Sequence, residues 1–216
     1  SALSERAAIV NFQRGWKPPV TGNDHPHTYD DGFVARAIAI GICTYDQPEL
    51  RACLIRWDGS VTHADDGMEA GAAMAETIAS GMRGESFQKM VENGISKLSS
   101  ESWVGVQCRK AVEIALRHHS PFAALPELDK EIISRIYNYG NLAPETLPIT
   151  YALFLLSEGK METAIPLANC FPRLSDSVPA FVGAMCGVYQ GEKSIPRNYE
   201  HYLNLPKGVC IPDMKD

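Results

Sequence analysis

The fold is decided by the stretch Arg173-Leu-Ser-Asp-Ser-Val-Pro-Ala-Phe-Val-Gly-Ala-Met-Cys-Gly-Val-Tyr189, in which a polar turn leads into an apolar segment. Pro179 is expected in the first turn of a helix, where its missing N–H costs least. Gly183 and Gly187 fall on one face of that helix, where we expect another backbone to approach closely. Because the apolar part is too short to span a bilayer, the pattern predicts a buried core helix.

Polar side chains mark the entrance to this predicted helix. Ser175 or Asp176 can cap it, because short polar side chains accept hydrogen bonds from the first free backbone amides. Arg173 and Ser177 lie on either side of that cap. A helix start with these groups offers oxygen ligands and backbone donors that can converge on a ligand. The entrance is therefore the first candidate site.

The run from Ser175 to Tyr189, followed by Ile195-Pro196, resembles the C-terminal signature of the ADP-ribosylglycohydrolase (crystallin J1-related) family. That signature reads Asp-x-Asp-Thr/Ser, then Ile/Val, a small residue, a Gly-Ala helix and Ile-Pro. Three earlier stretches agree in order: Asp31-Gly-Phe-Val-Ala-Arg36 resembles the family's Asn-Gly-Ala-Ala-Met-Arg, Val61-Thr-His63 its Thr-His, and Gly140 to Pro148 its Glu-Ser/Thr-x-Pro segment. The order of these stretches along roughly the whole chain carries the resemblance.

The sequence departs from the family's pattern in two respects. The family's first C-terminal aspartate falls on Leu174, which cannot ligate a cation. The family also begins with a Gly-Asp segment and a Thr/Ser-Asp-Asp-Thr motif that supply further metal ligands, and with a glutamate implicated in catalysis. Nothing in residues 1 to 216 reads Asp-Asp-Thr, since Asp30-Asp31 and Asp65-Asp66 are each followed by glycine. The resemblance therefore implies the C-terminal two-thirds of such a protein, with the N-terminal part of the fold missing.

Length and composition limit the class of protein. With 216 residues, 45% of them apolar, the chain can bury one substantial core, and we expect residues 1–216 to form a single α-helical domain. A formal net charge of −6 argues against a nonspecific nucleic-acid or anionic-membrane partner. No signal peptide or membrane span is visible. The six cysteines include no Cys-x-x-Cys pair, which favours mostly free buried thiols and a cytoplasmic location over a disulfide framework.

Helical periodicity recurs along the chain, and no strand-like alternation persists. Residues 15–27 break every pattern with prolines and glycines, so we expect a long loop, in which His25 and His27 favour a turn or surface role over metal binding. The tail from Leu203 to Pro212 is expected to be loop or short edge structure. Helices are expected at 4–14, 33–42, 48–57, 64–82, 85–98, 103–118, 126–137, 146–157 and after Ser177. The sequence predicts an all-α domain of orthogonally packed helices, which the resemblance also implies.

Two residues leave a structural and a functional interpretation open. Arg36 is the only charge in a predicted buried helix, so it needs either a structural ion pair or a partner at the ligand site. His63 precedes a helix that begins near Asp65; it is either a satisfied buried residue or a donor beside a helix N-terminus that binds a diphosphate or ribose. The resemblance favours the functional interpretation of both. For Glu145 it implies a structural tie inside the site.

The resemblance implies hydrolysis of a glycosidic bond at the anomeric carbon of ADP-ribose, with one or two magnesium ions. A carboxylate-rich pocket holds such a cation with hard oxygen ligands and stabilises an oxocarbenium-like transition state. Leu174 implies an altered site, with Mg²⁺ bound as a single ion or lost. The resemblance assigns metal binding to Asp176 and Ser177, and contact with an ADP-ribose-like or nucleoside-like ligand to Asp31, Gly32, Arg36 and His63.

Functions from two different classes fit these residues. The first is a hydrolase of ADP-ribose-linked or related N- or O-ribosyl substrates, a cleaved or two-chain protein whose N-terminal companion chain supplies the missing acids and the general base. The second is a noncatalytic ligand-binding or regulatory subunit that keeps the fold and has lost the full metal site. The presence of an N-terminal companion segment that contains Asp-Asp-Thr would favour the hydrolase, and its absence would favour the noncatalytic subunit. The joint presence of Asp176-Ser177, His63 and the Gly32/Arg36 pair favours the hydrolase.

Overall fold

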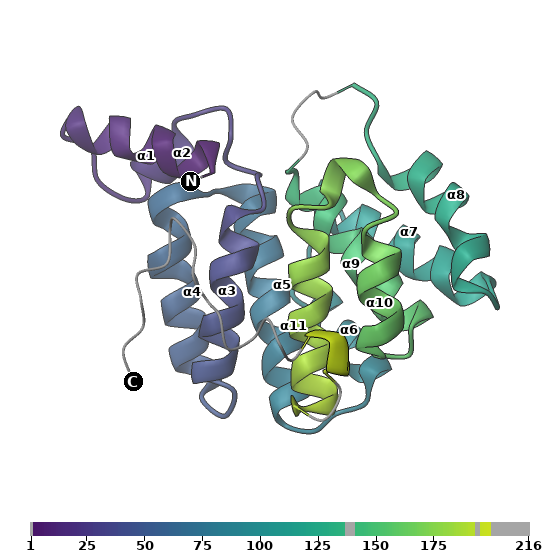
Figure 1. The fold of residues 1–216 in the computed structure, drawn as a ribbon. Helices are drawn as coiled ribbons and strands as arrows, with labels where there is room; N and C mark the ends of the chain where they lie inside the picture. The colour runs from purple at the N-terminus through teal and green to yellow at the C-terminus, as the bar shows by residue number, and fades with distance from the viewer. Residues whose placement is uncertain (1, 137–140, 193–194, 200–216) are drawn as a thin grey trace.

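The computed structural model describes residues 2–136, 141–192 and 195–199. These residues form helices joined by turns, with one isolated antiparallel bridge between Asp30 and Leu142, so the all-α prediction is confirmed for them (Figure 1). The helices are α1 (Leu3–Gln13), α2 (Val20–Asn23), α3 (Gly32–Cys43), α4 (Pro48–Thr62), α5 (Asp65–Met82), α6 (Phe87–Ile95), α7 (Trp103–Arg117), α8 (Pro121–Ile132), α9 (Ala143–Leu156), α10 (Met161–Ala168), the 3₁₀-helix η1 (Pro172–Leu174) and α11 (Val178–Gln190).

Most predicted helices are present, and the differences have local causes. α4 continues past Trp57 to Thr62 because Gly59 packs directly against the ring of Phe33, which offsets the low helix propensity of glycine. α8 begins at Pro121, since proline suits the first turn of a helix. α2 occupies part of the predicted long loop. α10 lies outside the predicted helices.

The core lies between α3, α5, α7, α9 and α11, and α10 packs against α11 (Figure 1). α5 admits close neighbours through its small residues: a Cβ on Gly71 would lie 2.3 Å from the ring of Phe33. The described residues do not place a close backbone at the glycines of α11, contrary to the prediction. A Cβ on Gly183 would meet Ile165 Cδ1 at 3.6 Å, and no described atom lies within 4 Å of one on Gly187.

Two segments far apart in the sequence pair beside the core. The Asp31 amide donates to the Asn141 carbonyl at 2.9 Å, and the Ala143 amide donates to the Tyr29 carbonyl at 3.0 Å. These bonds flank the isolated bridge and join the start of α3 to the start of α9. α1 and α2 lie across the ends of α3 and α4 (Figure 1), and Ser4 in α1 donates to Asp30 just before α3.

The cysteines within the described residues are free, as predicted. Two of these five are buried and one is half-buried, but Cys43 and Cys170 are exposed, so the expected burial holds only in part. Cys210 and the predicted tail from Leu203 to Pro212 lie outside the described residues. None of the described helices combines the length and apolar character that a membrane crossing requires.

Candidate functional site

Three helices start at one place in the fold: α3 after Asp31, α9 after Leu142 and α11 after Ser177. Asn141 connects these starts. Its Nδ2 donates to Asp176 Oδ2 at 2.7 Å and to Ser177 Oγ at 3.3 Å, and its carbonyl accepts the amide of Asp31. Because helix N-termini carry partial positive charge, the junction of α3, α9 and α11 favours the carboxylates of Asp31 and Asp176 that lie there.

Asp31 is the buried acid of this junction. It is 4% exposed, and its Oδ2 has no hydrogen-bond partner among the described residues. The hydroxyls of Ser177 and Thr146 lie beside its carboxyl group. Burial raises the pKa of Asp31 to about 7; the charges of Asp30 and Asp176 act in the same direction, while the hydrogen bond from Ser177 opposes them. A buried carboxyl group with an unused oxygen is one that a cation or a ligand hydroxyl would satisfy.

The oxygen donors of the junction are of the chemical kind that magnesium prefers. Asp31 and Asp176 offer carboxylates and Ser177 a hydroxyl, and Mg²⁺ commonly binds through one or two carboxylates while it keeps several waters. Within the described part of the chain, no cluster of three or more His, Cys, Asp or Glu side chains could hold a metal. Leu174, on which the resemblance places the family's first C-terminal aspartate, lies fully buried in the core. The ligand set is therefore partial, and the roles of Asp176 and Ser177 stay predictions.

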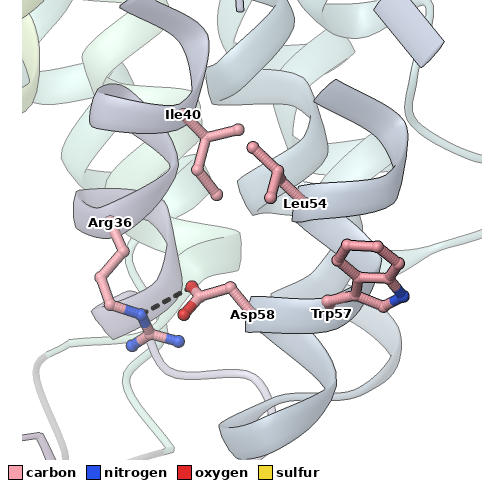
Figure 2. A pocket seen from close by; sticks show the side chains of 5 residues that line it. All are labelled: Arg36, Ile40, Leu54, Trp57 and Asp58. Carbon is pink, nitrogen blue, oxygen red and sulfur yellow. Dashed lines mark hydrogen bonds and ion pairs between the residues drawn. The ribbon is translucent and has the colours of Figure 1, made fainter. Parts of the chain in front are cut away.

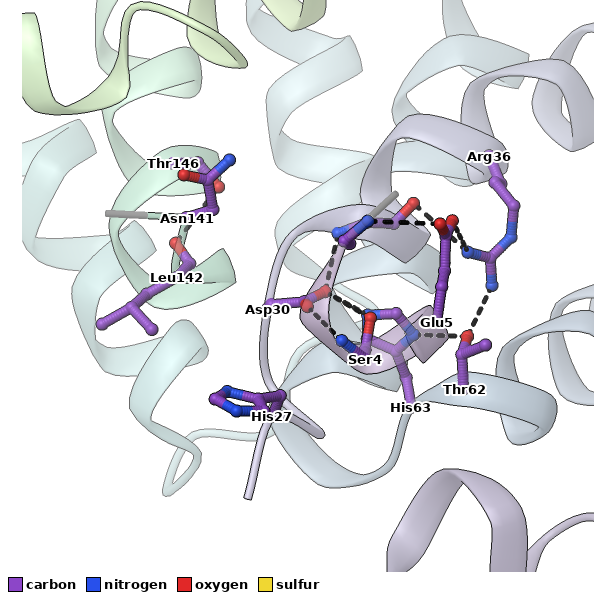
Figure 3. Close-up of polar contacts among 12 residues, drawn as sticks. Ser4, Glu5, His27, Asp30, Arg36, Thr62, His63, Asn141, Leu142 and Thr146 are labelled. Carbon is purple, nitrogen blue, oxygen red and sulfur yellow. Dashed lines mark hydrogen bonds and ion pairs between the residues drawn. The ribbon is translucent and has the colours of Figure 1, made fainter. Parts of the chain in front are cut away.

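Asp30, next to Asp31 in the sequence, belongs to a different set of contacts (Figure 3). Its carboxylate accepts hydrogen bonds from the Ser4 amide at 3.0 Å, Ser4 Oγ at 2.9 Å, the Gly32 amide at 3.0 Å and His63 Nε2 at 2.7 Å. Burial opposes its ionisation, but the bonds from His63 and Ser4 lower the pKa of Asp30 below its usual value. Asp30 is therefore a structural anion with both oxygens in use.

The predicted ligand residues Gly32 and His63 have polar groups that are engaged inside the protein. The Gly32 amide donates to Asp30, and the 2% exposed His63 has Nε2 against Asp30 and Nδ1 2.7 Å from Thr62 Oγ1. α5, which follows, carries two aspartates in its first turn, and their charge disfavours an anion there. These contacts support the structural interpretation of His63. Direct contact of Gly32 or His63 with a ligand stays a prediction.

Arg36 makes the intramolecular ion pairs that its structural interpretation predicts. Its Nε lies 2.8 Å from Asp58 Oδ2, and its Nη1 lies 3.5 Å from Glu5 Oε1. Its Nη2 donates to Thr62 Oγ1 at 2.7 Å. The buried part of α3 thus has the ion pair that its only charge requires, and a role of Arg36 at the ligand stays a prediction.

A groove of about 460 Å³ lies between α3 and α4 (Figure 2). Arg36 and Asp58 meet across it, and the apolar side chains of Ile40, Leu54 and Trp57 complete its lining. No residue of the α3, α9 and α11 junction lines this groove, so we assign it no part in the candidate site.

Glu145 ties the start of α9 to neighbouring segments. Its Oε1 accepts the Ser134 amide at 2.9 Å, and its Oε2 lies 3.4 Å from Arg173 Nε. Burial raises the pKa of Glu145, although the bond from Ser134 and the charge of Arg173 oppose the shift. These contacts agree with the structural tie that the resemblance implied.

His25 and His27 take part in a turn. The His27 amide donates to His25 Nδ1 at 3.1 Å, and His25 Nε2 lies 3.1 Å from the Thr62 carbonyl. Burial lowers the pKa of His25. These contacts support the predicted turn role.

The sequence did not single out Asp30, Asn141 or Thr146, which the structure brings to this region. The available signals were an acidic pair directly before a buried helix and an asparagine two residues before the start of another. Neither signal identifies its partner, because Asn141 reaches Asp176 across 35 residues of chain. The fold alone brings these groups together.

The amino-acid sequence was also compared with the sequences of known protein families. The sequence matches the family described as ADP-ribosylglycohydrolase over residues 2–212, nearly the whole chain. None of the curated proteins with which the sequence was compared matches it.

Proposed function

The chain belongs to the ADP-ribosylglycohydrolase family, and from this premise we propose that it hydrolyses the glycosidic bond of ADP-ribose-linked or related N- or O-ribosyl substrates. The observation that carries the proposal is the junction of α3, α9 and α11, where the buried Asp31 keeps an oxygen without a hydrogen bond from the described residues. A diphosphate suits helix N-termini, and ribose hydroxyls suit free carboxylate oxygens.

The family is generally metal-dependent, and the residues of the junction fit a magnesium ion. Asp31, Asp176 and Ser177 would hold it, and a bound ion would orient the ribose and position or activate a water. Asn141 keeps the Asp176 carboxylate in place through its 2.7 Å bond. The negative charge of the two carboxylates beside the anomeric carbon would favour an oxocarbenium-like transition state.

In this proposal the remaining predicted ligand residues, Gly32, Arg36 and His63, do not contact the substrate but position the residues that do. Gly32 opens α3 directly after Asp31, so its position sets where the Asp31 side chain lies. His63 and Arg36 are bonded to Asp30, Thr62 and Asp58 rather than to the junction itself. They hold the substrate-facing residues in place.

A companion chain completes the acidic set in this proposal. The described residues hold only a partial set of metal ligands, and the sequence contains no Asp-Asp-Thr. An N-terminal companion chain with that motif would add carboxylates and the general base. Intact mass measurement of the native protein, first under nondenaturing and then under denaturing conditions, tests for this second polypeptide.

One observation favours a second function, that of a noncatalytic ligand-binding or regulatory subunit. Leu174 is fully buried where the family has an aspartate, so that position offers no ligand to a cation. A protein with this change can keep the α3, α9 and α11 junction as a binding site for an ADP-ribose-like molecule while it lacks hydrolysis.

Calorimetric titration with ADP-ribose, with and without Mg²⁺, tests the proposed function. We expect binding that Mg²⁺ strengthens and that Asp31→Asn weakens at least about tenfold, which is 1.4 kcal/mol. Asp129→Asn is the matched control, because Asp129 is an exposed acid paired with Arg135 outside the junction. Turnover is tested separately with an N- or O-linked ADP-ribosyl substrate, because free ADP-ribose has no group to release at its anomeric carbon. Release of ADP-ribose from that substrate by water would establish the hydrolase. Binding without turnover, with and without any companion chain, would favour the subunit, and no binding would contradict both.

A further inference from the structure

We propose that Arg36 is a positioning residue that acts through Thr62 and His63 on Asp30, and so fixes the turn that carries Asp31. The proposal rests on the proposed function only in its last step, which makes Asp31 a substrate-facing residue. Every other step is a property of the folded protein. Figure 3 shows the chain of contacts that these side chains form.

The direction of the chain follows from its two ends. A guanidinium group can only donate, so the 2.7 Å contact between Arg36 Nη2 and Thr62 Oγ1 makes that oxygen an acceptor. A carboxylate can only accept, so the 2.7 Å contact with Asp30 Oδ1 places a hydrogen on His63 Nε2. In a neutral ring Nδ1 is then an acceptor, and the Thr62 hydroxyl, 2.7 Å away, donates to it. Each link therefore has one donor and one acceptor, in the order arginine, threonine, histidine, aspartate.

The far end of the chain is the turn before α3. Asp30 also accepts the amides of Ser4 and Gly32, so its carboxylate fixes the backbone on both sides of Asp31. The amide of Asp31 is held by the carbonyl of Asn141. An anchored backbone on either side leaves the Asp31 side chain little freedom to leave the junction of α3, α9 and α11.

The near end of the chain is fixed as well. Asp58 and Glu5 hold the guanidinium of Arg36, which also lies over the ring of Phe33 at 5.2 Å from its centroid. The same ring lies 5.8 Å from the His63 ring, centroid to centroid. Packing thus restrains the first and third members, and the hydroxyl of Thr62 is the one link between them that a single small substitution removes.

Thr62→Val is the test, with Thr62→Ser as the conservative variant that keeps the hydroxyl. Thr77→Val is the matched control, because Thr77 is also buried and bonded to two partners, the Ala73 carbonyl at 2.9 Å and the Tyr151 hydroxyl at 2.7 Å. The readouts are the ¹⁵N resonances of the His63 ring, the hydrogen exchange of the Asp31 and Gly32 amides, and calorimetric titration with ADP-ribose in the presence of Mg²⁺.

In the unsubstituted protein we expect a His63 ring with hydrogen on Nε2 and an accepting Nδ1. Thr62→Val should shift the Nδ1 resonance, speed exchange at Asp31 and Gly32, and weaken ADP-ribose binding about tenfold, whereas Thr62→Ser restores all three. Thr77→Val should change none of them.

A hydrogen on Nδ1 in the unsubstituted protein would overturn the proposal, and so would unchanged exchange in Thr62→Val. The resonance and exchange measurements need no ligand. If the unsubstituted protein fails to bind ADP-ribose, the proposed function therefore fails. The resonance and exchange measurements still test whether the chain of contacts positions the turn that carries Asp31. If Thr62→Val does not fold, Arg36→Lys, which keeps the charge and loses the fork of donors, is measured in its place with the same readouts.

Discussion

Asp30 and Asp31 are neighbours in the sequence and opposites in their surroundings. Asp30 accepts four hydrogen bonds, and its pKa lies below the usual value despite burial. Asp31 is as deeply enclosed, but one of its oxygens has no donor among the described residues, and burial raises its pKa to about 7. The first belongs to the framework around α1, α3 and α4. The second has the unmet bonding capacity that a ligand or cation would use, so hydrogen bonding distinguishes these two acids and burial does not.

The largest expected effect comes from removal of the framework acid. Asp30→Ala should lower the free energy of unfolding by about 3 to 5 kcal/mol, because it leaves Ser4, Gly32 and His63 without their common acceptor. Urea denaturation at neutral pH measures it. Asp129→Ala, which breaks only an exposed ion pair, should cost at most about 1 kcal/mol. If Asp30→Ala lowered the free energy of unfolding no more than Asp129→Ala, the distinction between Asp30 as a framework acid and Asp31 would be wrong.

Asp31→Asn should change stability in the opposite direction. In a buffer that contains a chelator at pH 8, we expect a gain of about 1 to 2 kcal/mol in the free energy of unfolding, because the substitution removes a buried charge with too few donors. Calorimetric titration should show weaker binding of Mg²⁺ to the same variant. A variant that is less stable and binds Mg²⁺ normally would assign Asp31 to the framework instead.

The pH dependence of Glu76 extends the comparison to a second well-partnered acid. Burial opposes its ionisation, but Arg51 at 2.9 Å and Arg83 at 3.0 Å lower the pKa of Glu76. A lowered folded-state pKa gives stability that is present above the unfolded-state pKa and lost as the pH falls through the folded one. Glu76→Gln should therefore cost about 1 to 2 kcal/mol near pH 7 and progressively less below about pH 4. Urea denaturation of both proteins across this pH range measures the difference in unfolding free energy. A difference that does not change with pH would contradict the prediction.

A pair of serines gives the smallest expected effects. Ser4→Ala removes the 2.9 Å bond to Asp30 and should cost about 1 kcal/mol of unfolding free energy. Ser177→Ala removes a hydroxyl that bonds to the Asp31 carboxyl group and lies 3.3 Å from Asn141 Nδ2, and it should also cost about 1 kcal/mol. Only this variant should weaken Mg²⁺ binding. Thermal denaturation and metal titration of both variants measure these effects. Unchanged Mg²⁺ binding in Ser177→Ala would show that both serines serve the framework.

The sequence predicts the helices better than it predicts the junction. Periodicity and capping signals locate most helices, and the exceptions involve packing that a local pattern does not contain, such as Gly59 against Phe33 within α4. The order of motifs identified the family, which the match over residues 2–212 shows. The contacts of Asn141 with Asp31 and Asp176 depend on the meeting of segments far apart in the chain, and no spacing rule encodes them. Arg36 and His63 show the same limit, since a charged residue that needs a partner does not reveal which partner it has.

Leu174 limits which substitutions its position can accept. Its side chain is fully buried among core residues, so an aspartate there would place a carboxyl group in an apolar interior and leave a void. Such changes commonly cost several kcal/mol, which is a large part of the stability of an ordinary domain. A designer who wanted another acidic ligand at the junction would therefore introduce it at an exposed position rather than at the buried Leu174.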